Sequence, residues 1–182
     1  MPLLTTVREL HLLGVKLADL VRLPDERGIF TEIMRADWRE MLNEDSIVQA
    51  NFSVTYPGII RAWHRHVRGQ TDYFLVLSGS IKVCAYDDGE DSPTRGHLVE
   101  VVLSGDRMQI LRVPGKYWHG FKVVSPKPAY LIYFVNNLYD YASPDEERRP
   151  WNDPNVIPIA INGRRDDPRV GKPWDWLYSP HR

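Results

Sequence analysis

The stretch Gly58-Ile-Ile-Arg-Ala-Trp-His-Arg-His-Val-Arg-Gly-Gln-Thr-Asp-Tyr-Phe-Leu-Val-Leu-Ser-Gly79 organises our interpretation of the chain. It begins and ends on glycine, and apolar residues flank its polar centre. Side chains in a strand repeat every two residues, so His64 and His66 share one face if this segment is extended. Arg61 lies three residues before His64, and it then points to the opposite face unless a bulge re-aims it.

A third histidine, His119, follows a Pro-Gly turn in Pro114-Gly-Lys-Tyr-Trp-His-Gly-Phe121. The two histidine-bearing segments are separated by glycine-rich turn regions. This arrangement indicates one pocket inside a small β-barrel.

From residue 46 onward, apolar β-formers alternate with turn signals such as Pro-Gly, Ser-Gly and Asp-Gly. Short strands with regular turns are typical of an antiparallel sandwich or barrel. A single short helix is expected at residues 36–42, with Asp37 as a possible cap. The expected strands cover residues 47–55, 73–77, 81–86, 97–103, 108–113, 121–124 and 129–135.

Length and composition limit the possible classes of protein. The 182 residues fit a single domain, with a core at about residues 10–140 and an irregular segment at 141–182. Trp151, Trp174 and Trp176 in that segment argue against simple disorder, because such side chains gain most when they are buried. The 23 basic and 24 acidic residues nearly cancel, so neither nucleic acid nor a membrane is an expected partner.

Cys84 is the only cysteine, so no internal disulfide can form. Neither a signal peptide nor a membrane span is visible in the sequence. We therefore expect a cytoplasmic protein.

Several motifs, taken in order along the chain, now match one family. They occupy residues 25–32, 49–53, 58–64, 69–73, 92–94, 114–121, 133–139, 143–147 and 151–154. Together they resemble the dTDP-4-dehydrorhamnose 3,5-epimerases of deoxysugar biosynthesis, over about residues 20–155. The resemblance implies an all-β cupin jelly-roll, which is a double-stranded antiparallel β-barrel, with a few short helices and an irregular C-terminal segment.

The resemblance also implies the reaction. The enzyme would be an isomerase that epimerises a nucleotide-diphospho-4-keto-6-deoxyhexose at C3, C5 or both, in dTDP-rhamnose or related biosynthesis. It would need neither a metal nor another cofactor. A homodimer is expected, and exposed barrel edges give a physical motive for pairing between subunits.

Catalytic roles follow from the matched positions. His64 resembles the base that removes a proton next to the ketone, and Tyr133 the acid that returns a proton on the opposite face. Tyr139 is the alternative acid, and His119 matches a second active-site histidine. The remaining matched positions, which the resemblance assigns to substrate binding, are Arg27, Phe30, Glu32, Gln49, Asn51, Arg61, Gln70, Asp72 and Tyr139.

Within this binding set, Arg27, Gln49, Asn51 and Arg61 match groups that hold the diphosphate and nearby nucleotide. Phe30 and Glu32 match positions that contact the base.

The chain departs from the family pattern in three places. Asp72 stands where the family usually has a lysine that helps to stabilise the enolate oxygen. The acidic partner of the base has no clean match, so Asp166 or Asp167 is the candidate, and Asp167 is our choice. His66 is not typical of the family. Either another cation replaces the lysine, or the substrate and the number of reacting centres differ.

The residue types suit this chemistry. A proton next to a ketone is only weakly acidic, and histidine is a base with a pKa near the working pH. The enolate puts charge on the keto oxygen, which needs a waiting donor. Arginines bind a diphosphate through forked, charge-assisted contacts remote from the reacting carbons.

Three other interpretations compete. His64 in an apolar strand could be an ordinary core histidine. A metal-binding cupin, either a dioxygenase or an isomerase, could use His64, His66 and His119 with Gln70 or Asp72 to hold iron, nickel, manganese or zinc. A non-catalytic cupin that binds a sugar nucleotide would account for the missing lysine.

Overall fold

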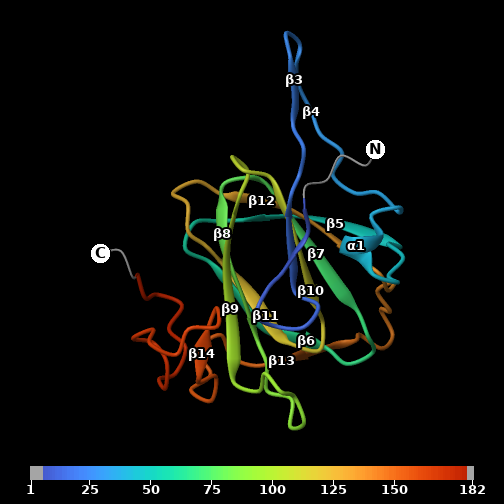
Figure 1. Ribbon diagram of the computed structural model, residues 1–182. Helices are drawn as coiled ribbons and strands as arrows, with labels where there is room; N and C mark the ends of the chain where they lie inside the picture. Colours follow the sequence, from blue (N-terminus) through green and yellow to red (C-terminus); the bar gives the residue numbers. More distant parts are fainter. Residues whose placement is uncertain (1–5, 180–182) are drawn as a thin grey trace.

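The computed structural model describes residues 6–179, so residues 1–5 and 180–182 of the expected domain lie outside it. Two six-stranded sheets face each other in a jelly-roll, which confirms the expected fold (Figure 1). The first sheet has the order β1 (Arg8–Glu9), β2 (Lys16–Asp19), β10 (Gln109–Pro114), β7 (Thr71–Ser78), β12 (Ala129–Val135) and β5 (Gln49–Thr55). The second has the order β13 (Glu146–Arg148), β6 (Ile60–His66), β11 (Trp118–Val123), β8 (Ser80–Tyr86), β9 (His97–Ser104) and β14 (Ala160–Ile161).

Neighbours in each sheet come from distant parts of the chain. β7 pairs with β10 and β12, and β11 pairs with β6 and β8, all antiparallel. The chain therefore crosses repeatedly between the sheets, and their inward side chains form the central core. Phe74, Val83, Leu111 and Leu131 are among its buried members. The strands expected from turn signals all form, with ends that differ by a few residues.

The helix expected at residues 36–42 is shorter. α1 spans Arg39–Leu42, and Asp37 does not cap it, because its carboxylate accepts hydrogen bonds from Arg35 at 2.7 and 2.8 Å. Met41 and Leu42 are buried in a second core cluster. Within residues 6–179, no helix has the length and apolar content needed to cross a membrane.

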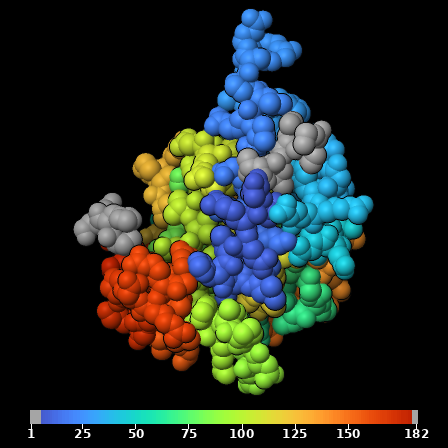
Figure 2. Space-filling model, viewed as in Figure 1, coloured from blue at the N-terminus to red at the C-terminus, as the bar shows by residue number. Residues whose placement is uncertain are grey.

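A hairpin formed by β3 (Leu23–Asp25) and β4 (Gly28–Phe30) stands away from the barrel (Figures 1 and 2). Its two strands pair only with each other. All six of their residues are exposed, and Phe30 shows 62% of its surface. An apolar ring this exposed, on a two-stranded hairpin, is typical of a surface that another chain covers.

The irregular C-terminal segment lies over the outer face of the second sheet. Trp174 and Trp176 are buried there, and the ring centroids of Trp63 and Trp176 are 4.9 Å apart. β14 extends the sheet by pairing in parallel with β9. The expectation that these tryptophans oppose disorder therefore holds for Trp174 and Trp176, while Trp151 is 43% exposed.

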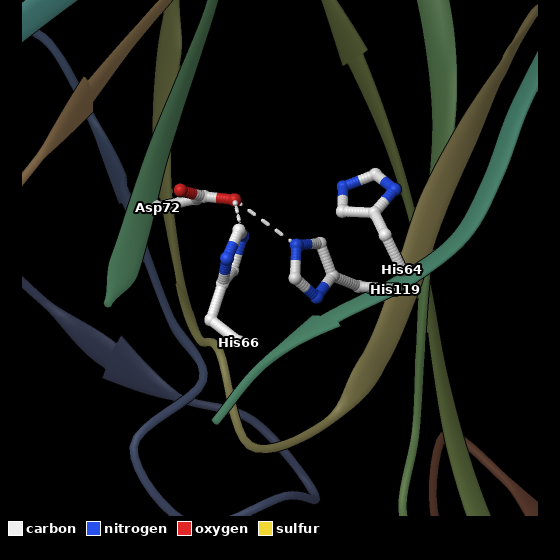
Figure 3. Close-up of side chains that lie close together, drawn as sticks. All are labelled: His64, His66, Asp72 and His119. Carbon is white, nitrogen blue, oxygen red and sulfur yellow. Dashed lines mark hydrogen bonds and ion pairs between the residues drawn. The ribbon is translucent and has the colours of Figure 1, made fainter. Parts of the chain in front are cut away.

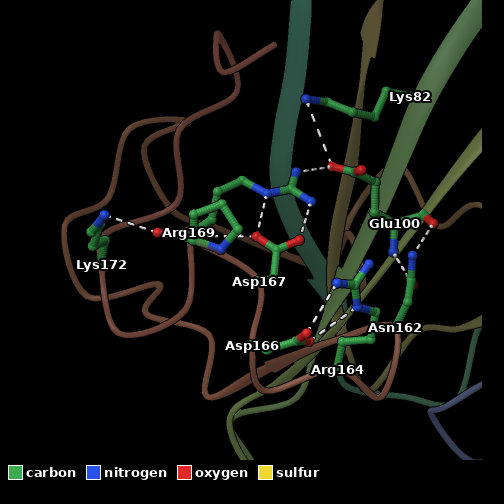
Figure 4. A network of polar contacts seen from close by, with 9 residues as sticks. Lys82, Glu100, Asn162, Arg164, Asp166, Asp167, Arg169 and Lys172 are labelled. Carbon is green, nitrogen blue, oxygen red and sulfur yellow. Dashed lines mark hydrogen bonds and ion pairs between the residues drawn. The ribbon is translucent and has the colours of Figure 1, made fainter. Parts of the chain in front are cut away.

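A network of charges fastens this segment to β9 (Figure 4). Arg169 donates to both oxygens of Asp167 at 2.9 Å and to Glu100 at 2.8 Å, and Lys82 lies 3.8 Å from the same Glu100 oxygen. The hydrogen bonds from Arg169 lower the pKa of Asp167 to about 2. The neighbouring pair Arg164 and Asp166 is largely exposed.

We predict that Asp167→Asn lowers the free energy of unfolding at pH 7 by about 1–2 kcal/mol, allowing for partial solvent screening. A depressed folded-state pKa contributes stability above the unfolded value of 3.8, and this is lost as pH falls toward about 2. The difference from the wild type should therefore shrink between these pH values in urea unfolding. Asp166→Asn is the matched control, and it should cost less than about 0.5 kcal/mol.

Candidate active site

A cavity of about 410 Å³ opens between the two sheets. Its walls combine apolar rings with polar and charged groups from strands far apart in the sequence. The lining residues are Ser53, Ile60, Arg61, Ala62, Trp63, His64, Phe74, Phe121, Leu131, Tyr133, Glu146, Arg148 and Arg149.

An irregularity in β6 shapes one wall of this cavity. His64 pairs with His119, but Arg61 pairs with Phe121, so Ala62 and Trp63 together oppose the single residue Gly120. This is the β-bulge that the sequence left open, and the extra residue changes the alternation of side chains. As a result both Arg61 and His64 line the cavity.

His64 and Tyr133 reach the cavity from opposite sheets. His64 lies on β6 and Tyr133 on β12, and both line the hollow. Burial, followed by the charge of His119, lowers the pKa of His64 well below the ordinary value of 6.5. Burial, followed by the charge of Asp72, raises the pKa of Tyr133. At neutral pH, the site thus has an unprotonated imidazole and a protonated phenol.

Beside His64, a buried cluster crosses from one sheet to the other (Figure 3). Oδ2 of Asp72, on β7, lies 3.0 Å from Nε2 of His119 on β11 and 3.5 Å from Nε2 of His66. The ring centroids of His64 and His119 are 4.3 Å apart. Burial raises the pKa of Asp72, but its histidine neighbours outweigh burial and hold it well below the usual range.

Three of the predicted site residues lie in this cluster and outside the cavity lining, so their roles stay predictions. His119, expected in a catalytic role, is fully buried beside His64 and does not line the cavity. Asp72 and Gln70, expected to bind substrate, do not line it either. The Gln70 amide donates to Asp72 at 2.9 Å and contacts His66 at 3.2 Å. These residues form a buried layer behind His64 in which the Asp72 carboxylate is paired, as a buried carboxylate must be.

Gln49 and Asn51 lie on the inward face of β5. Asn51 pairs directly with Tyr133, and the Gln49 amide donates to Asn51 at 2.8 Å. The backbone N–H of Tyr139 donates to Gln49 at 3.0 Å, but the Tyr139 ring is half-exposed beside Tyr141. None of Gln49, Asn51 and Tyr139 lines the cavity itself.

Four other predicted residues do not reach this cavity in their own chain. Arg27 pairs with Asp25 on the projecting hairpin, which also carries the exposed Phe30, and Glu32 pairs with Arg35. Asp167, the expected acidic partner of the base, is held by Arg169 in the C-terminal network, so that role stays a prediction.

Sequence reasoning missed Ser53, Glu146 and Arg148. Glu146 and Arg148 belong to β13, where Arg148 pairs in register with His64. Both line the cavity, while the intervening Glu147 bonds Arg65 at 2.6 Å. This alternation was present in Glu146-Glu-Arg-Arg149, but the pairing of this strand with β6 could not be read from it.

A jelly-roll cavity with a neutral imidazole on one wall and a protonated phenol on the other suits an isomerase that works by proton transfer. The comparisons with known proteins agree. The chain belongs to the dTDP-4-dehydrorhamnose 3,5-epimerase family, whose model matches residues 9–171.

Individual relatives extend this result. A probable low-salt glycan biosynthesis epimerase, Agl13 of Haloferax volcanii, is 46% identical over 76% of this chain and 87% of its own. The spore coat polysaccharide biosynthesis protein SpsL of Bacillus subtilis is 37% identical over 79% and 92%. A solved structure of dTDP-6-deoxy-D-glucose-3,5-epimerase from Legionella pneumophila is 30% identical, with a TM-score of 0.73 over 81% of this chain and 79% of that one.

The bulge can be tested through Gly120. A Cβ at this position would lie 2.3 Å from Cβ of Ala62 and 2.6 Å from the carbonyl oxygen of Arg61. We predict that Gly120→Ala costs about 1–3 kcal/mol in thermal unfolding and also lowers activity, because His64 must shift with the strand. Gly89→Ala is the control, since its nearest contact is 3.2 Å. Equal behaviour of the two variants would contradict this account.

Proposed function

We propose that the protein epimerises a dTDP-linked 4-keto-6-deoxyhexose at a carbon next to the ketone. The observation that carries this proposal is the placement of His64 and Tyr133 on opposite walls of one cavity. Inversion of a carbon centre needs a proton taken from one face and another delivered to the opposite face. A base and an acid on facing walls meet that requirement.

The substrate assignment rests on two supports. The Legionella relative was solved in complex with dTDP-4-keto-L-rhamnose. In this chain, Arg61 and Arg148 line the cavity, and guanidinium groups suit the diphosphate of such a nucleotide. Gln49 and Asn51 do not line the cavity itself, but they lie on the same face of β5 as Ser53, which does, so their amides lie beside it.

The reaction then follows from the protonation states. Neutral His64 takes the proton from the carbon next to the ketone, and the electron pair of the broken C–H bond moves into the enolate. Tyr133 delivers its proton to the opposite face of that carbon. The imidazolium of His64 then releases its proton to solvent, and the phenolate of Tyr133 takes one up. His119 packs against His64 and holds its ring in place. Positioned acid–base groups of this kind contribute about 10²–10⁴-fold to rate.

Two variants separate the base from the acid. With a dTDP-4-keto-6-deoxyhexose in heavy water, we predict that His64→Gln lowers deuterium uptake at C3 and C5 by at least about 100-fold. Tyr133→Phe should keep deuterium uptake with retained configuration, because His64 can return a proton to the face from which it came, but it should lose inversion. Mass spectrometry and NMR of the product measure the two effects. Inversion at the wild-type rate in Tyr133→Phe would contradict the assignment of the acid.

We also propose a homodimer in which each hairpin completes the site of the partner. Arg27 and Phe30 project away from their own cavity on a hairpin that pairs with nothing else among the described residues. The family resemblance places these positions at the nucleotide, so a second copy would bring them there. Sugar-nucleotide metabolism and the single buried Cys84 support a cytoplasmic location.

Mixing of subunits tests the shared site. Arg27→Ala and His64→Gln should each be nearly inactive alone, because each site then lacks one required group. Refolding them together should restore activity, since a mixed dimer has one site with both groups intact. Steady-state rates before and after mixing measure this. A mixture no more active than its parents would contradict contribution in trans, whereas a monomer in analytical ultracentrifugation would contradict the dimer itself.

A further inference from the structure

Three buried acceptor atoms point at one another beside the catalytic base. They are Oδ2 of Asp72, Nε2 of His119 and Nε2 of His66, and the Asp72 oxygen lies 3.0 and 3.5 Å from the two nitrogens. Together with a ring nitrogen of His64, they lie within 4.8 Å of one another. Figure 3 shows Asp72 facing both histidines, with the His64 ring beyond His119.

The hydrogen bonds of His119 fix which nitrogen carries its proton. Nδ1 lies 2.8 Å from the carbonyl oxygen of Tyr117, which can only accept. Nδ1 therefore donates, and in a neutral imidazole Nε2 is left with a bare lone pair. That lone pair faces the carboxylate of Asp72.

The same reasoning applies to His66. Its Nε2 lies 3.2 Å from the amide nitrogen of Gln70, which can only donate, and that amide also donates to Asp72 at 2.9 Å. Nε2 of His66 therefore carries a lone pair at the edge of the cluster, and the Gln70 amide is its partner when no ion is bound. A proton shared by His119 and Asp72 would satisfy that pair. A cation bound between the three atoms would instead bind the lone pairs of both histidines and neutralise the buried carboxylate.

We propose that His66, Asp72 and His119 form a site for a divalent transition-metal ion. Two imidazoles and one carboxylate are ligands that zinc, iron and manganese accept, and this set leaves coordination positions open. Donor atoms around zinc at about 2.1 Å stand roughly 3.4 Å apart, close to the distances found here. The Tyr117 carbonyl holds the other ring nitrogen of His119, as carbonyls do in metal sites.

His64, the proposed base, lies next to the metal site but is not one of its three ligands. His64 lines the cavity and is not required as a ligand, so it stays available to take a proton. If the proposed epimerase reaction holds, a bound cation would supply positive charge beside the carbon at which the enolate forms. Charge fixed near a developing oxyanion lowers the barrier to proton removal.

Metal binding is tested on the full chain without a histidine tag, after treatment with a chelator. Zn²⁺ is titrated by calorimetry, and Co²⁺ is followed by its visible absorption. We expect one equivalent per chain, and binding weakened by at least about 100-fold in Asp72→Asn and in His66→Gln. His11→Gln, at an exposed histidine, should bind as the wild type does. Circular dichroism checks that each variant is folded.

Two results would contradict the proposed metal site. The first is that the wild type binds no Zn²⁺, which would mean that protons alone occupy the cluster. The second is that Asp72→Asn and His66→Gln both bind Zn²⁺ as the wild type does. Deuterium exchange at the sugar is measured separately, on metal-free and zinc-loaded protein. Exchange that rises at least about tenfold with zinc supports the role of the cation. Equal deuterium exchange in metal-free and zinc-loaded protein contradicts a role of the cation in the reaction but not its binding. Stoichiometric binding of zinc without any deuterium exchange contradicts the epimerase proposal but not the metal site.

Discussion

The contact of Asp72 with His119 and His66 joins the two sheets, and the site depends on it. Asp72 is 3% exposed, and a carboxylate buried so deeply must be paired to be tolerated. Its partners come from β11 and β6 of the opposite sheet. Satisfying this charge therefore fixes how closely the sheets approach beside the cavity. His64 lies two residues from His66, so the same contact sets the position of the base.

The strand that carries the base is held from both of its faces. On the inner face, the bulge opposite Gly120 brings Arg61 and His64 into the cavity together. On the outer face, Trp63 packs against Trp176 of the C-terminal segment. That segment is irregular in backbone, yet it buries the outer side of the catalytic strand. Its contribution to the site is rigidity, because tightly packed rings leave β6 little freedom to move.

Features that depend on neighbouring residues in the sequence could be predicted from it. Turn signals and apolar runs gave the jelly-roll strands, and the shared face of His64 and His66 follows from the period of a strand. Pairings between distant segments were beyond reach. Asp37 was expected to cap a helix, but its carboxylate is held by Arg35. The carboxylate of Asp167, the expected partner of His64, is held by Arg169. Residues Glu146–Arg148 have no strong strand pattern, and they form β13 because β6 offers an open edge.

The acid at position 72 raised the concern that it would repel a developing oxyanion. The carboxylate faces two histidines and does not line the cavity, but its charge still reaches the site, because it raises the pKa of Tyr133. The electrostatic demand of the reaction remains, since substrate brings a diphosphate and the enolate adds further negative charge. Arg61 and Arg148 line the cavity and carry positive charge that suits the diphosphate. The enolate needs positive charge close to His64. We place it at the proposed cation site beside that ring, because an anionic oxygen and two imidazole nitrogens together attract a cation.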